Sequence, residues 1–365
     1  MKILLFDMDG VLINPQGYHR ALHETVRLAG ISTGCGPKEL DGEQVARFEA
    51  LGISSEWHST ALCMAVMALE KQAGLNGVFN PPNSSGLNLE LLFRALDDQP
   101  MNLSALQRGV AAVEFLAQKF EVPADPYRNL VARSESIDYS PTLNWFQELI
   151  LGSQEFSNIY QKEAQFQTDS YLLCYDEPLL GVNQSKKIVV WVAEPDHAAA
   201  IMTNRPSKGP SGFSGMPDAE MGAKLAGISD LPLVGKGEIL WLAAHTGQTV
   251  EEISIPAWKH AFSAILAACG WTIEDCLKYF CILPKDWEKT GLQFLNGSTL
   301  IVFEDTPGGM VSVQEAAKFL CDLGIQVEVK KMGITDGAAK HESLLAQKAS
   351  IYADINQALT SLDYF

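Results

Sequence analysis

The first residues of the chain form a short apolar run that requires burial on both faces. Ile3 to Phe6 are four apolar residues in succession, and Asp7 follows them directly. Such a run, ended by an acidic turn, is typical of a central strand in a parallel sheet, where helices cover both faces. The next strand-like runs lie beyond about Lys187. The first strand must therefore be buried by a sheet built from the far end of the chain.

The residues between these two parts have helical patterns. Helical stretches are predicted from Tyr18 to Leu28, from Ser54 to Ala73, and after Ser140, which can cap a helix that begins with Pro141. In the clearest case, apolar residues recur at spacings of three and four and fall on one helical face. They are Leu103, Leu106, Val110, Val113, Leu116 and Phe120. We predict a helical domain, residues 17–181, inserted after the first strand.

Beyond Lys187 the pattern changes to strand-like runs that alternate with helices. This alternation predicts the α/β class, with a doubly wound, Rossmann-like parallel sheet formed by residues 1–16 and 182–365. Helices are expected at His260–Ala268 and Val311–Leu320. The expected strands are Ile188–Val192, Ala198–Met202, Tyr279–Leu283, Leu300–Phe303, Gln326–Val329 and Ser350–Ala353.

Charge and cysteine content restrict the possible partners and compartments. The chain has 27 Lys and Arg against 44 Asp and Glu, a formal net charge of -17, which opposes binding to a nucleic-acid backbone. No run approaches the ~20 apolar residues of a membrane span. The seven cysteines contain no C-x-x-C motif, and the amino end lacks a signal-peptide core. We expect a cytoplasmic protein without a nucleic-acid or membrane partner; the oligomeric state stays open.

Acidic pairs end two of the apolar strands. Asp7 and Asp9 follow the first, and Glu304 and Asp305 end the strand at Leu300–Phe303. An EF-hand does not fit the D-x-D-G sequence, because its first ligand position would be a leucine. Ligands of open α/β sheets bind beyond the carboxyl ends of the strands, where these acids can converge on one hard divalent cation.

A further strand end carries neutral polar groups. Thr203 and Asn204 follow the strand at Ala198–Met202, and their hydroxyl and amide groups suit phosphate oxygens. Gly10 in the first acidic turn and Arg20 just beyond it complete the predicted substrate-binding residues.

With these motifs in order, the chain resembles the haloacid dehalogenase superfamily, in the subclass with an α-helical cap. The first motif, D-x-D-G-V/T-L, implies that Asp7 is the nucleophile and Asp9 the acid/base. The second implies a role for Thr203. The fourth motif, E-D-[ST]-x-x-G, occurs in beta-phosphoglucomutase-like and phosphoglycolate phosphatase-like members and matches Glu304 and Asp305. The resemblance implies that Mg²⁺ is bound by Asp7, Asp9, Glu304 and Asp305.

The third motif departs from the family pattern. A lysine is expected there, often as K-P-x-x-x-x-A, but the best alignment places Ile255 before Pro256. Lys259 lies one helical turn, about 5.4 Å, farther along, and its long stem can return toward the site. Lys236, in a loop, is the second candidate. A site without a lysine is the remaining possibility.

These features predict a magnesium-dependent phosphatase that acts on a small phosphorylated metabolite through an aspartyl-phosphate. An anionic nucleophile such as Asp7 needs a cation to approach a phosphoryl group. The acid at Asp9 disfavours the dehalogenase branch. Two alternatives stay open, namely a phosphomutase of the beta-phosphoglucomutase type and a non-catalytic protein that binds metal and phosphate.

Overall fold

The computed structural model describes residues 1–53, 55–100, 103–213, 215–281 and 291–362. They divide into a core unit, Met1–Pro15 with Asp176–Phe365, and an inserted unit, Gln16–Tyr175. The expected second boundary, at residue 181, lies six positions later in the chain than Tyr175. The short strand β2 (Ile13–Asn14) pairs with β3 (Glu177–Pro178), which keeps the residues after Tyr175 with the core unit.

The core unit is built on a parallel sheet. Its strand order is β5-β4-β1-β6-β7-β8, and β1 pairs in parallel register with β4 on one side and β6 on the other. All the carboxyl ends of these strands therefore lie along one edge. The strands are β1 (Lys2–Phe6), β4 (His197–Met202), β5 (Leu233–Val234), β6 (Ser298–Glu304), β7 (Val327–Ile334) and β8 (Ser350–Tyr352).

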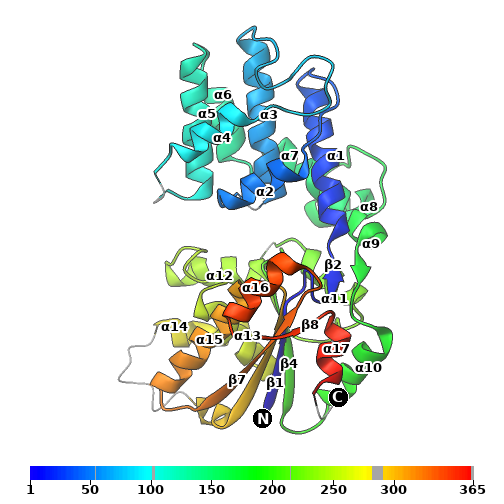
Figure 1. Cartoon of the computed structure of the whole chain (residues 1–365), viewed down its shortest axis with the longest axis vertical. Helices are drawn as coiled ribbons and strands as arrows, with labels where there is room; N and C mark the ends of the chain where they lie inside the picture. The colour runs from blue at the N-terminus through cyan, green and yellow to red at the C-terminus, as the bar shows by residue number, and fades with distance from the viewer. Residues whose placement is uncertain (54, 101–102, 214, 282–290, 363–365) are drawn as a thin grey trace. The chain divides into compact units, whose positions relative to one another are not determined.

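Helices cover both faces of this sheet (Figure 1). Ile3 and Leu5 of β1 pack into one apolar cluster, and Leu4 and Phe6 pack into another, because successive strand residues point to opposite faces. All four side chains are fully buried, and each contributes roughly 1.5–3 kcal/mol to folding. The apolar run at the amino end is thus explained by helices on both sides.

Different helices cover the two faces of the core sheet. Helices α12 to α16 supply residues to the first cluster, and α10, α11 and α17 supply the second. The predicted helices at 260–268 and 311–320 are confirmed within α13 and α15. The helices are α10 (Val182–Trp191), α11 (Asp218–Leu225), α12 (Lys236–Thr246), α13 (Trp258–Ala268), α14 (Ile273–Cys281), α15 (Pro307–Asp322), α16 (Ala338–Ala346) and α17 (Ile355–Thr360), with a 3-10 helix at Leu292–Leu295.

Two predicted strands are wrong. The expected strand at Ile188–Val192 belongs mostly to helix α10, which buries Ile188 and Trp191 and leaves Val190 exposed, so its burial follows a helical period. At 279–283, residues 279–281 end helix α14, and 282–283 lie outside the described residues. The two-residue strand β5 is too short to give a periodic signal and was not predicted.

The inserted unit is helical in its described residues, apart from an isolated bridge between Glu39 and Gly86. Its helices bury a separate apolar core, to which α3 and α5 contribute Val66 and Val113. In the described part of the whole chain, no helix combines the length and apolarity needed to span a membrane. The helices are α1 (Gln16–Ser32), α2 (Gly42–Ala50), α3 (Glu56–Gln72), α4 (Glu90–Asp97), α5 (Ala105–Lys119), α6 (Asp125–Ala132), α7 (Pro141–Leu151), α8 (Ser153–Tyr160) and α9 (Tyr171–Tyr175).

Candidate active site

Asp7 stands directly after the central strand of the sheet. Its backbone N–H donates to the carbonyl oxygen of Phe303 in β6 at 3.0 Å, which extends the parallel pairing by one residue. Desolvation raises the pKa of Asp7 well above its usual value, and the negative charges of Glu304, Asp9 and Asp305 raise it further. The charged form of the side chain is therefore disfavoured, and a bound cation would stabilise it.

Glu304 is the last residue of β6 and is held at the start of α15. Thr306 donates to Glu304 Oε2 from both its backbone N–H and its hydroxyl, each at 3.0 Å. Burial raises the pKa of Glu304 to about 7 against the effect of these hydrogen bonds. A Cβ on Gly309 would lie 1.8 Å from Glu304 Oε1. The glycine of the E-D-[ST]-x-x-G pattern is thus required to make room for the glutamate.

Asp305 lies against the turn that follows β1. Gly10 in that turn has a φ of +76°, and a Cβ there would lie 2.3 Å from Asp305 Oδ2. A side chain is excluded at this position by both the backbone conformation and the contact. The glycine predicted for substrate binding therefore also allows the first and fourth motifs to approach each other.

Three carboxylates come together at this edge of the sheet. Within the described part of the chain, Asp7, Glu304 and Asp305 form the group that can hold a metal ion, with one ligand oxygen from each lying within 4.8 Å of the others. Carboxylate oxygens are the ligands that Mg²⁺ prefers, so this donor set fits the expected ion. Asp9, the fourth predicted ligand, is not in this group.

Asp9 instead faces a buried arginine. Arg205 Nε donates to Asp9 Oδ1 at 2.9 Å and to Oδ2 at 3.1 Å, while its Nη2 contacts Asp176 Oδ2 at 2.9 Å. The Arg205 side chain is 2% exposed and that of Asp176 is fully buried. Neither was among the predicted site residues. Arg205 follows Thr203 and Asn204 at a strand end, which is a usable signal, but Asp176 has no local signal.

Thr203 and Asn204 lie where the second motif was expected. Thr203 is 1% exposed, and its N–H donates to Val234 O at 3.1 Å. Its Oγ1 accepts a hydrogen bond from Arg205 N at 3.2 Å, which leaves the hydroxyl hydrogen to donate. Asn204 beside it is exposed. The edge of the sheet thus offers one buried hydroxyl and one accessible amide.

At the position where a lysine was expected, the structure places the apolar side chain of Ile255. A Cβ added to Gly308, the second residue of α15, would lie 3.1 Å from the Cγ2 methyl group of Ile255. Buried His260 holds this segment, because its Nδ1 accepts from Ile255 N at 3.2 Å and its Nε2 lies 3.0 Å from Val234 O. Ile255 therefore stands beside the start of α15, and this helix begins two residues after Asp305.

The candidate lysines have different surroundings. Lys259 Nζ lies 5.9 Å from the ring centroids of both Trp258 and Phe280. Lys236 begins α12, where its backbone N–H donates to Arg205 O at 2.8 Å. A lysine that was not predicted, Lys340 of α16, forms an ion pair with Asp305 Oδ2.

Arg20, predicted to bind substrate, belongs to helix α1 of the inserted unit. Its guanidinium carbon lies 4.3 Å from the ring centroid of Tyr175, and Tyr175 packs edge-on against Tyr171. The arginine is exposed, so its cationic group is accessible within that unit. Its role in substrate binding stays a prediction.

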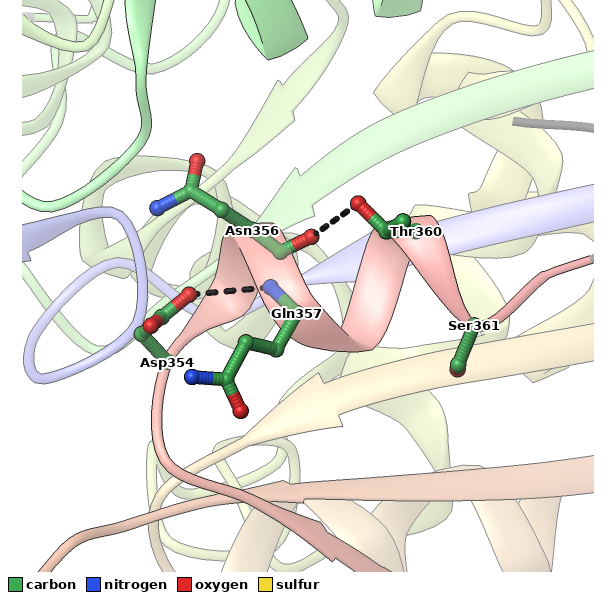
Figure 2. A pocket seen from close by; sticks show the side chains of 5 residues that line it. All are labelled: Asp354, Asn356, Gln357, Thr360 and Ser361. Atoms are coloured by element: carbon green, nitrogen blue, oxygen red, sulfur yellow. Dashed lines mark hydrogen bonds between the residues drawn. The ribbon is translucent and has the colours of Figure 1, made fainter.

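A separate depression in the core unit does not resemble an active site. It has a volume of about 510 Å³ and is lined by α17 and by the residues at its two ends, Asp354 and Ser361 (Figure 2). Asp354 Oδ1 accepts from Gln357 N at 2.9 Å, and Thr360 Oγ1 donates to Asn356 O at 2.7 Å. The first of these hydrogen bonds caps the N-terminal end of α17, and the second lies within the helix.

Comparisons with known proteins agree with the fold. No protein-family model matches the chain, and no curated protein is significantly similar to it. An X-ray structure of a Northeast Structural Genomics Consortium target matches with a TM-score of 0.62 and 14% identity, over 100% of this chain and 98% of the other. This likeness supports the fold alone.

Two further structures match with lower scores. One is a putative beta-phosphoglucomutase from Thermotoga maritima, with a TM-score of 0.38, 13% identity, and coverage of 99% of this chain and 100% of the other. The other is a phosphatase, Tt82, from Thermococcus thioreducens, with a TM-score of 0.48, 12% identity, and coverage of 94% and 99%. At these scores neither bears on function. The parallel sheet and the helical unit inserted between β2 and β3 give this chain an α/β fold with an inserted helical unit.

Proposed function

We propose that the chain is a magnesium-dependent phosphatase of the haloacid dehalogenase superfamily, acting on a small phosphorylated metabolite. The observation that carries this proposal is the convergence of Asp7, Glu304 and Asp305 at the carboxyl ends of two adjacent parallel strands. Three carboxylates in one place repel one another and lose hydration. An arrangement that costs folding free energy in this way is typical of a site that binds a cation for function.

The three carboxylates would hold Mg²⁺. When bound, the ion supplies the positive charge that lets an anionic nucleophile and an anionic phosphoryl group approach each other. Asp7 is the nucleophile in this proposal, because it follows the central strand and lies within the group. Asp9 is two residues away, with its carboxylate directed by Arg205.

The reaction has two halves. In the first, a carboxylate oxygen of Asp7 attacks phosphorus, the bond from phosphorus to the ester oxygen breaks, and Asp9 gives that oxygen a proton. In the second, Asp9 takes a proton from a water molecule that attacks the aspartyl-phosphate, and the Asp7–phosphorus bond breaks to release phosphate. The Thr203 hydroxyl donates a hydrogen bond to a phosphoryl oxygen in both halves.

One observation favours a second candidate, a protein that binds metal and phosphate without turnover. Ile255 occupies the position of the expected lysine beside Gly308, so the cation usually found there is absent from that position. A phosphomutase shares the acidic group and differs in retaining the phosphoryl group, so product analysis separates it from a phosphatase.

The test is hydrolysis of p-nitrophenyl phosphate with and without Mg²⁺ by wild type, Asp7→Asn and Asp322→Asn. Asp322 is an exposed acid at the end of α15 and serves as the matched control. We expect magnesium-dependent turnover in wild type and Asp322→Asn and its loss in Asp7→Asn, with a phosphorylated wild-type species in mass spectra of the quenched reaction. Magnesium-dependent phosphate binding without turnover would instead favour the second candidate.

A further inference from the structure

Among the described residues, the acidic group has a partner of opposite charge that the family pattern does not predict. Lys340, on the first turn of α16, reaches Asp305 Oδ2 with its ammonium group. Asp305 is 7% exposed and Lys340 is exposed, so the lysine approaches the group from solvent. This contact joins the helix after β7 to the acid after β6.

This contact lies next to the turn of the first motif. Asp305 Oδ2, the same oxygen that Lys340 contacts, lies 2.3 Å from where a Cβ of Gly10 would stand. The ammonium and the D-x-D-G turn therefore both lie against the same oxygen of Asp305. Asp305 has a second carboxylate oxygen, so a metal ion and Lys340 can be bound at once.

Arg205 pairs with Asp9 and Asp176, and the charges that raise the pKa of Asp7 are negative. The charges that act most on Asp7 are those of Glu304, Asp9 and Asp305. At the expected lysine position the chain has Ile255, and Lys259 Nζ lies over two aromatic rings. A dianionic phosphoryl group needs charge-assisted donors as well as a metal ion.

We propose that Lys340 supplies the ammonium group of the phosphate site, in place of the lysine expected at position 255. The proposal rests on the proposed function. Lys340 donates to Asp305 when no substrate is bound and to a phosphoryl oxygen when substrate is present. The four-carbon stem is flexible, and its side chain is 53% exposed, so the ammonium can shift between these two acceptors.

The experiment compares wild type with Lys340→Met, Lys340→Arg and Lys318→Met. Lys318 is an exposed lysine on α15 that is paired with Glu315, and it is the matched control. Three quantities are measured: kcat/KM for p-nitrophenyl phosphate and, by calorimetry, the affinity for inorganic phosphate and the affinity for Mg²⁺ alone. The double variant Ile255→Lys with Lys340→Met returns an ammonium group from the expected position.

We expect Lys340→Met to lower kcat/KM and phosphate affinity by about 10- to 100-fold, the loss of one charge-assisted hydrogen bond. The affinity for Mg²⁺ alone should be retained or increased, because the lysine no longer occupies Asp305. Lys340→Arg and the double variant should recover part of the loss, and Lys318→Met should match wild type. A purely structural ion pair would not produce this separation of phosphate from Mg²⁺ binding.

Unchanged phosphate affinity in Lys340→Met would overturn the proposal. A loss that neither Lys340→Arg nor Ile255→Lys reverses would also overturn it, because the effect would not follow the charge. If wild type binds phosphate but does not hydrolyse the ester, hydrolysis is refuted while the phosphate affinities still test Lys340. If wild type binds no phosphate with Mg²⁺, both proposals fail.

Discussion

Arg205 Nη2 lies 2.7 Å from Asp9 Oδ1, and the same nitrogen lies 2.9 Å from Asp176 Oδ2. One buried guanidinium thus joins the second acid of the D-x-D-G turn to the first residue of the core unit after the insertion. The fork geometry of arginine fixes the direction of the Asp9 carboxylate in a way that a lysine would not. The acid/base proposed here is therefore positioned by an arginine that lies two residues after Thr203.

Replacing Arg205 should destabilise the protein strongly. In Arg205→Met the Asp176 carboxylate, which is fully buried, loses this cation, and breaking a buried ion pair costs about 3–5 kcal/mol. Urea denaturation measures the free energy of unfolding. Arg128→Met is the control, because Arg128 forms ion pairs on the surface, where the expected change is below about 1 kcal/mol. Equal losses in the two variants would contradict a special role for Arg205.

His260 should contribute to the pH dependence of the free energy of unfolding. Burial lowers the pKa of His260 to about 4 from an ordinary value of 6.5. The unfolded chain therefore binds the proton more readily than the folded protein. The stabilisation from the neutral ring is fully present above about pH 6.5 and is lost as the pH falls toward 4, with a total on the order of 3 kcal/mol.

The variant His260→Gln separates the contribution of His260 from those of the other titrating groups. The raised pKa values of Asp7 and Glu304 act in the opposite direction, since protonation of those acids favours the folded state as the pH falls. The difference in unfolding free energy between wild type and His260→Gln, measured by denaturation from about pH 7 to pH 4.5, should shrink with falling pH. A constant difference would mean that His260 does not titrate as described.

Removal of the proposed nucleophile should stabilise the metal-free protein. Asp7→Asn relieves both the desolvation of an anion and its repulsion by Glu304 and Asp305. We expect a rise in Tm of about 2 to 4 °C, equivalent to about 1 kcal/mol in domains of this size. Added Mg²⁺ should raise the Tm of wild type more than that of the variant. A lower Tm for metal-free Asp7→Asn than for wild type would show that Asp7 is not repelled by its neighbours.

Gly309→Ala tests the packing of Glu304. The new Cβ would lie 1.8 Å from Glu304 Oε1, so the glutamate or the helix must move. Overpacking of this kind costs about 1–3 kcal/mol, and Mg²⁺ affinity should fall because a ligand is displaced. Gly42→Ala at the start of α2 is the matched control, since nothing lies within 4 Å of its added Cβ. Calorimetric titration with Mg²⁺ and thermal melting check both effects, and wild-type Mg²⁺ affinity in Gly309→Ala would refute the displacement.

Local patterns predicted the elements that carry the acidic group. The apolar runs before Asp7 and Glu304 are strands β1 and β6 because each is a continuous run ended by an acid, and that signal is contained within a few residues. An apolar run without an acid directly after it, Ile188–Val192, was wrongly predicted to be a strand. Its burial follows a helical period, and the flanking sequence extends the helix to ten residues.

The amino-acid sequence by itself determined the α/β class, the insertion after the first strand and the acids that follow β1 and β6, since burial of an apolar run and the turn after it are local properties. Only the tertiary structure decided which charges meet. Arg205 reaches Asp176 across 29 positions, and Lys340 reaches Asp305 across 35. A long flexible side chain can serve many neighbours, and strand order and helix placement select the one that it contacts.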